Sequence, residues 1–155
     1  MLDKLNILIF TIFNVGKLPA SGTFASIVTI FFYYAIISFF SKNMFVFIFI
    51  TITIYSFLFL KNILKKFNNK DPKEIVIDEF IGQSIPLLIC GKDIVLILLS
   101  CLIFRIFDIF KIFPANIFDK KISGTTGVIG DDIIAGIYTV LIIYIIKINT
   151  WKKTR

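Results

Sequence analysis

Long apolar runs separated by short polar segments dominate the chain, and they predict helices that cross a membrane. The strongest runs cover residues 24–40, 44–60 and 133–146, and only a short polar turn at residues 41–43 separates the first two. A helix needs about 20 consecutive, mostly apolar residues to span a bilayer. We therefore expect a helical hairpin from the first two runs and a last span from the third.

Two shorter apolar stretches lie between these spans. Residues 75–90, which include Pro86, and residues 94–104 flank a turn at residues 91–93, and the second stretch continues toward residue 113. Each uncharged leg is short for a full crossing. The legs are either spans whose charged ends lie inside the protein or a re-entrant pair, and both arrangements require the polar groups to face protein or water.

The remaining segments complete a single domain of residues 1–155. Residues 5–13 are apolar but short, and no clear cleavage site follows them. They predict a retained helix lying at the membrane interface rather than a signal peptide. Residues 114–130 contain Pro114 and three glycines and predict a loop. The expected fold is an all-α integral membrane helical bundle, with about four hydrophobic helices plus the N-terminal interfacial helix.

Composition supports lipid as the main solvent and excludes several functions. Hydrophobic residues make up 57% of the chain and the mean hydropathy is +0.92, whereas a soluble domain has about 45–50% apolar residues. The net charge of +7 does not indicate nucleic acid, because the basic residues flank apolar runs and form no stripe with aromatic platforms. Anionic lipid headgroups are the expected partner. Cys90 and Cys101 lie in apolar runs and indicate buried small residues rather than a disulfide or zinc site.

The charge pattern also bears on topology and mechanism. Five lysines between residues 61 and 79 predict that this segment is cytoplasmic. A last span would then place Lys147 and the basic C-terminus outside, against the same tendency, so the topology of residues 75–113 and of the C-terminus stays open. The chain has no histidine, which excludes every mechanism with a histidine base, nucleophile or ligand.

Eight of the ten acidic residues gather in two regions of the chain. Only Asp3 and Asp93 lie elsewhere; the two groups are Asp71, Glu74, Asp78 and Glu79, and then Asp108, Asp119, Asp131 and Asp132. Several of them sit at the edges of apolar runs, where a bare carboxylate is costly. In the expected topology these edges meet on one side of the membrane, so distant carboxylates can converge.

A convergence of carboxylates at this position predicts a site for a hard divalent cation. Magnesium takes oxygen ligands, usually one or two carboxylates together with waters and substrate phosphate. The candidate ligands are Asp78, Glu79, Asp108, Asp131 and Asp132. An alternative for Asp131 and Asp132 alone is an acidic helix N-terminus, which the helix dipole favours.

Basic and small residues next to these acids are candidates for binding a phosphate group. Arg105 and Asp108 share a helix face at i, i+3, and the arginine either pairs with the aspartate or binds phosphate bidentately. Lys111 follows Asp108 at the same i, i+3 spacing and could add positive charge. Gly22 and Thr23 open the first span, where free N–H groups can meet an anion, although an ordinary turn and helix cap would use the same residues. Cys-x5-Arg, Asp-x-Asp and Walker signatures are absent.

Taken together, these segments resemble the bacterial phosphatidylglycerophosphatase A family. The similarity rests on residues 70–83 (KDPKEIVIDEFIGQ), 104–111 (FRIFDIFK) and 130–136 (GDDIIAG), with the Gly22–Thr23 helix start. Three features depart from the family pattern: Ser21 stands where a proline is usual, Ile112 follows Lys111 in place of a proline, and the glycine-rich approach to the paired aspartates is altered. These changes affect loop stiffness more than ligand chemistry.

The resemblance implies a magnesium-dependent lipid phosphatase of the bacterial inner membrane. Such an enzyme removes the terminal phosphate of phosphatidylglycerophosphate, within the bilayer, in phospholipid biosynthesis. The residues on the family's motifs are Asp78, Glu79, Arg105, Asp108, Lys111, Asp131 and Asp132, and Asp119 matches a further acidic position. The expected site is catalytic and faces the cytoplasm, with Gly22, Thr23, Arg105 and Lys111 toward the phosphate.

Other functions remain open from the residues alone. A phosphatase of another lipid-linked phosphate would need similar ligands. A cation transporter could use buried acids, but it would need polar residues along the middle of several spans, and few are present. A structural membrane subunit leaves the clustering of acids unexplained. A homo-oligomer is also left open.

Overall fold

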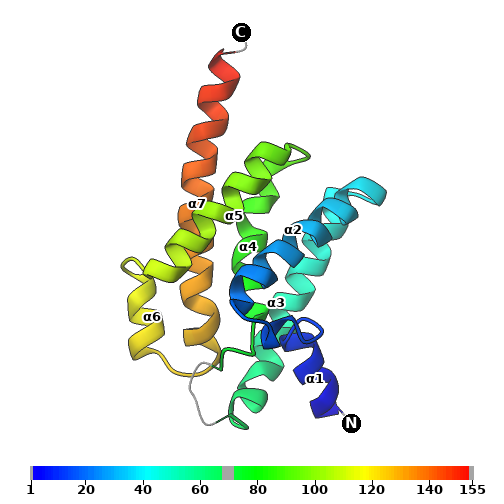
Figure 1. Cartoon of the computed structure of the whole chain (residues 1–155), viewed down its shortest axis with the longest axis vertical. Coiled ribbons are helices and arrows are strands. Elements are labelled where there is room, and N and C mark those ends of the chain that lie inside the picture. The colour runs from blue at the N-terminus through cyan, green and yellow to red at the C-terminus, as the bar shows by residue number, and fades with distance from the viewer. Residues whose placement is uncertain (1, 68–71, 154–155) are drawn as a thin grey trace.

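The computed structural model of the chain describes residues 2–67 and 72–153, and this part is helical without strands. The predicted all-α fold is confirmed. Figure 1 shows the arrangement of the helices. In order they are α1 (Leu2–Phe10), the 3-10 turn η1 (Val15–Lys17), α2 (Ser21–Phe39), α3 (Lys42–Leu64), α4 (Ile77–Cys90), α5 (Ile94–Phe110), α6 (Ala115–Lys121) and α7 (Thr125–Lys153).

Three helices are long and apolar enough to cross a membrane. They are α2, α3 and residues 125–150 of α7, which confirms the three expected spans. The short turn between α2 and α3 is fixed by Ser41, whose hydroxyl accepts a hydrogen bond from the backbone N–H of Met44. Such an N-cap satisfies a donor that the first helical turn leaves free.

The two shorter legs form a hairpin in which α4 is largely buried and α5 keeps one face exposed. Helices α4 and α5 have 14 and 17 residues, short of the length needed to cross. Gly91 adopts a positive φ of 63° at the turn, and Asp93 accepts hydrogen bonds from the N–H groups of Val95 and Leu96 to start α5. Both helices pack against α7, and α2 and α3 lie on the other side of α4 (Figure 1).

The interior divides into two apolar clusters along the bundle. One joins α1, α3 and α4 through Phe10, Leu60 and Ile81, and the other joins α2, α4 and α7 through Tyr33, Leu87 and Ile143. The outer faces of the long helices carry many exposed Phe, Ile and Leu side chains. Such extensive apolar exposure is unusual for a water-soluble monomer and fits a lipid environment.

Helices α4 and α7 approach each other closely, and this contact depends on two glycines. A Cβ at Gly136 would lie 2.5 Å from the carbonyl oxygen of Gly82, and a Cβ at Gly82 would lie 2.7 Å from the carbonyl oxygen of Asp132. Small residues let membrane helices approach to backbone contact. This approach brings the second turn of α7 next to the start of α4.

Replacing Gly136 with valine should therefore loosen the α4–α7 contact. Overpacking a close interface typically costs about 1–3 kcal/mol, so the melting temperature of the purified protein in detergent should fall. The neighbouring Ile137→Val change removes a methylene from an exposed side chain and serves as the control. Equal melting temperatures for the two variants would contradict the proposed role of Gly136.

Two predicted boundaries are wrong. Residues 114–130 are not one loop, because they contain α6 and the first six residues of α7. Two of their three glycines serve close packing, because a Cβ at Gly127 would collide with the backbone of Ile122 and one at Gly130 with the ring of Phe118. The third, Gly124, has a positive φ of 80° just before α7. The N-terminal helix ends at Phe10 instead of residue 13, since the next residues turn through positive φ values.

Candidate active site

A polar pocket of about 340 Å³ lies where four helices meet. It is formed by the start of α2, the start of α4, the end of α5 and the second turn of α7. The structure brings together all nine residues that the sequence singled out for this site. They are Gly22, Thr23, Asp78, Glu79, Arg105, Asp108, Lys111, Asp131 and Asp132.

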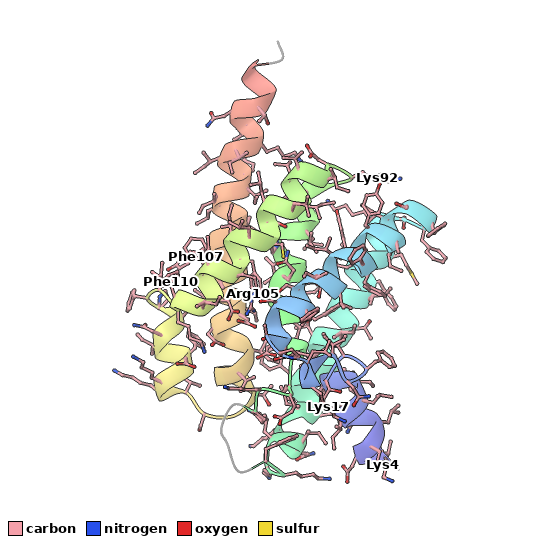
Figure 2. The ribbon with its side chains drawn as sticks, in the orientation of Figure 1. Lys4, Lys17, Lys92, Arg105, Phe107 and Phe110 are labelled. Atoms are coloured by element: carbon pink, nitrogen blue, oxygen red, sulfur yellow. The ribbon has the colours of Figure 1, made fainter. Side chains whose placement is uncertain are left out.

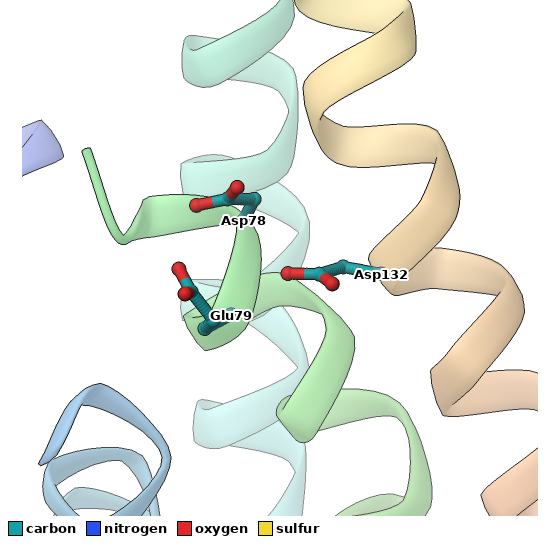
Figure 3. A group of neighbouring side chains, drawn as sticks. All are labelled: Asp78, Glu79 and Asp132. Carbon is teal, nitrogen blue, oxygen red and sulfur yellow. The ribbon is translucent and has the colours of Figure 1, made fainter. Parts of the chain in front are cut away.

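Three carboxylates form the centre of the pocket. One oxygen from each of Asp78, Glu79 and Asp132 lies within 4.8 Å of the others, and Figure 3 shows the two α4 side chains and the α7 side chain directed toward one another. Asp78 is only 7% exposed and Asp132 only 3%. Three clustered acidic groups with so little solvent repel one another when ionised, and a cation held between them would offset this repulsion.

The local fold explains why these acids meet. Asp78 and Glu79 lie in the first turn of α4, where the helix dipole favours negative charge. The N–H of Val76 donates to the carbonyl of Phe10 and anchors the chain just before the helix. Asp132 reaches them from α7 because Gly82 lets its backbone approach. Asp132 lies in the second turn of α7, beyond the first turn in which the helix dipole favours negative charge. The alternative of an acidic helix N-terminus therefore does not explain Asp131 and Asp132.

Arg105 lies beside this centre on the face of α5 that it shares with Asp108. Its guanidinium forms an ion pair with Asp108, and one of its nitrogens lies 3.9 Å from Glu79. A Cβ at Gly22 would come within 3 Å of both terminal guanidinium nitrogens, so the glycine leaves room for the arginine. Nε of Arg105 is buried without a hydrogen-bond partner among the residues described. The ion pair with Asp108 is present, and Nε remains as a hydrogen-bond donor for a ligand.

Lys111 forms a second charged group at the rim of the pocket. It follows the end of α5 with a left-handed backbone, at φ 44°, and not on the continuing helix that we expected. Its Nζ lies 2.5 Å from Asp119 and 2.8 Å from Asp131. Desolvation disfavours its charged form, but the two carboxylates outweigh it and raise the pKa of Lys111. The lysine therefore keeps its charge at neutral pH.

The predicted ligands thus separate into two groups. Asp78, Glu79 and Asp132 offer the oxygen-only donor set that magnesium prefers, and Oε2 of Glu79 is buried with no hydrogen-bond partner in residues 2–67 and 72–153. An orphaned buried acceptor is costly, and a bound cation would satisfy it. Asp108 and Asp131 lie in the same pocket but pair with Arg105 and Lys111.

Other polar residues at the pocket were not singled out from the sequence. Lys73 and Ser21 line it, and the Ser21 hydroxyl donates to the carbonyl of Lys73. Lys73 is one of five lysines in its segment, and no sequence signal separates it from the others. Lys70 and Asp71, which belong to the same motif, lie outside the described residues.

Comparisons with known proteins show which sequences this chain resembles. The chain is 40% identical over 78 residues to phosphatidylglycerophosphatase A of Haemophilus influenzae, covering 50% of this chain and 48% of the relative. It is 39% identical over 77 residues to the protein of that name from Escherichia coli, covering 49% and 45%. A Bacteroides thetaiotaomicron protein provisionally named phosphatidylinositol-3-phosphatase is 32% identical over 90 residues, covering 56% and 55%.

The matched region spans about half the length of each of these relatives, and no solved structure gave a significant match. The sequence profile described as Phosphatidylglycerophosphatase A covers far more of the chain and matches residues 8–147. That range includes every residue of the pocket described above. The chain therefore belongs to the phosphatidylglycerophosphatase A family.

Proposed function

We propose that this protein is a magnesium-dependent phosphatase that converts phosphatidylglycerophosphate to phosphatidylglycerol and inorganic phosphate, a step of phospholipid biosynthesis. The observation that carries the proposal is the pocket itself, in which buried carboxylates from two helices face a guanidinium and an ammonium group. Magnesium phosphatase chemistry uses this combination of oxygen ligands and phosphate-binding cations. The names of the two bacterial relatives supply the substrate.

The residues of the pocket have separate tasks in this reaction. Asp78, Glu79 and Asp132 would hold the cation, which supplies Lewis-acid polarisation of a phosphoryl oxygen. Arg105 binds the phosphate through its planar donor fork and stabilises the charge that builds up in the transition state. Water attacks the phosphorus and a neighbouring carboxylate accepts its proton. The P–O bond to the glycerol breaks, and the glycerol oxygen takes up a proton from that carboxylate and leaves as a hydroxyl group. Lys111, held by Asp119 and Asp131, adds positive charge at the headgroup.

We further propose that the site faces the cytoplasm at the bacterial inner membrane. Figure 2 shows Lys4 and Lys17 at the end of the bundle near the pocket, and Lys92 at the far end. Lys65 and Lys66 follow α3 at the same end as Lys4, since Lys66 forms an ion pair with Asp3. Clusters of lysine mark the cytoplasmic side of membrane proteins. The far end carries Lys42 and Lys147, which lie near Gly91, besides Lys92, and α7 ends with Lys152 and Lys153. The proposal therefore rests on the lysines next to the pocket, of which Lys73 lines it.

Phosphate release from the purified protein tests this function. Phosphatidylglycerophosphate in mixed micelles should yield inorganic phosphate with magnesium, and a chelator should stop the release until magnesium is restored. The proposal fails if no phosphate appears under either condition.

A second candidate is a phosphatase of another lipid phosphate, and the Bacteroides relative is the observation that favours it. Phosphatidylinositol 3-phosphate in the same assay separates the two candidates, because the better substrate has the higher kcat/KM.

A cation transporter finds less support. The buried hydroxyls of Ser26, Thr29, Ser84 and Thr139 bond to carbonyls of their own helices, and the acids gather at one end.

A further inference from the structure

A long apolar groove runs between α2 and α5, and no step of the reaction described above uses it. Its volume is about 810 Å³, more than twice that of the polar pocket. Ile27, Ile30 and Phe31 line one wall, and Leu98 and Leu102 line the other. Phe31, Leu98 and Leu102 are exposed, so the groove opens to the lipid around the bundle.

The groove continues directly into the polar pocket. Thr23, Arg105 and Ile109 line both cavities. The guanidinium of Arg105 therefore stands at the junction, with an apolar channel on one side and the carboxylate centre on the other. In Figure 2 Arg105 lies in the middle of the molecule, whereas Phe107 and Phe110 lie farther out, toward α6. A ligand that fills both cavities would carry its negative charge next to the arginine and its apolar part away from it.

The length of the groove matches one half of a bilayer. Its lining on α5 extends from Ile94 to Ile109 and on α2 from Thr23 to Tyr34. At about 1.5 Å per helical residue, these walls are about 22 Å and 16 Å long. The hydrocarbon core of a bilayer is about 30 Å thick, so one leaflet accounts for about 15 Å. An acyl chain anchored by its headgroup at the pocket would fit along the groove.

We infer that the α2–α5 groove is the acyl-chain site of the protein. One fatty acyl chain of an anionic phospholipid lies in the groove while its terminal phosphate enters the polar pocket past Arg105. This inference rests on the proposed function for the identity of the phosphate ester. It adds the path by which a lipid reaches the carboxylates: sideways from the membrane, between α2 and α5. It also makes the groove a determinant of specificity, because a water-soluble phosphate would lack the apolar contacts.

Filling the groove with a larger side chain tests the inference. Leu98 and Leu102 are 60% and 59% exposed in the groove, and Val95, outside its lining, is 61% exposed on the same helix. In each of the three variants, tryptophan replaces a lipid-facing residue of α5, so the variants differ mainly in whether the residue lines the groove. We expect Leu98→Trp and Leu102→Trp to lower kcat/KM for diacyl phosphatidylglycerophosphate at least tenfold, and Val95→Trp to change it less than twofold. Equal rates for the three variants would overturn the inference.

A second measurement keeps the inference testable if the proposed substrate is wrong. Phosphatidic acid with a photoreactive diazirine midway along one acyl chain should crosslink to peptides of α2 and α5 in the wild-type protein. Leu98→Trp should reduce this labelling and Val95→Trp should not. Labelling confined to other helices would refute the acyl-chain site. Labelling of the groove without phosphate release would overturn the proposed function alone.

Discussion

The Asp132→Asn variant should lose phosphatase activity while becoming more resistant to unfolding. Asp132 is 3% exposed and faces Asp78 and Glu79, and it forms no ion pair with a basic residue in the described part of the chain. Asparagine keeps the shape and removes one of three clustered acidic groups, which relieves their mutual repulsion, so the melting temperature should rise. Activity should fall more than about a hundredfold, the scale for losing one group that stabilises the transition state.

Two measurements and one control separate these effects. The melting temperature is measured without divalent cations, and phosphate release is measured with saturating magnesium. Asp93→Asn provides the matched control, because Asp93 caps α5 away from the pocket and asparagine caps helices equally well. If Asp132→Asn were as active as Asp93→Asn, the catalytic role of Asp132 would be refuted.

Arg105→Gln should abolish activity and, unlike the change at Asp132, destabilise the protein. The guanidinium is the ion-pair partner of Asp108 and approaches Glu79. Removing it leaves mostly buried carboxylates uncompensated, and breaking a buried pair in this way costs up to about 3–5 kcal/mol. Phosphate release should fall more than about a hundredfold, because the transferred phosphate loses its bidentate donor.

Two further variants show whether Arg105 acts only as a structural partner. The double change Arg105→Gln with Asp108→Asn removes both charges, so it should recover much of the melting temperature without recovering activity. Arg105→Lys keeps the charge but not the planar fork, and it should retain the fold with strongly reduced kcat/KM. Full activity in the double variant would show that the arginine is dispensable for the reaction.

The helices could be predicted from sequence wherever an apolar run ended at a short polar turn. The polar turn at residues 41–43 and the Gly91–Asp93 turn both follow apolar runs of helical length, and both turns are found. Helix α6 was missed because the glycines around it were interpreted as loop residues. Gly127 and Gly130 instead permit contact with Ile122 and Phe118. A close helix contact and a flexible loop require the same residue type, so the sequence alone does not separate them.

The members of the site were predictable, but their division into groups was not. Acids at the ends of apolar runs pointed to a common pocket, and the structure places Asp78, Glu79, Asp108, Asp131 and Asp132 in it. The pairing of Asp131 with Lys111 depends on the left-handed turn at Lys111. Nothing in the local sequence indicates that turn. The three-carboxylate centre therefore emerged only from the three-dimensional arrangement.

Cation binding by the purified protein tests the central claim most directly, independently of any substrate. Electron paramagnetic resonance measures free Mn²⁺ during titration of the wild type, Asp78→Asn, Glu79→Gln, Asp132→Asn and the control Asp93→Asn. We expect the wild type and Asp93→Asn to bind Mn²⁺ in competition with Mg²⁺, and the three other variants to bind it at least tenfold more weakly. Unchanged Mn²⁺ affinity in all three would contradict a shared cation site built by α4 and α7.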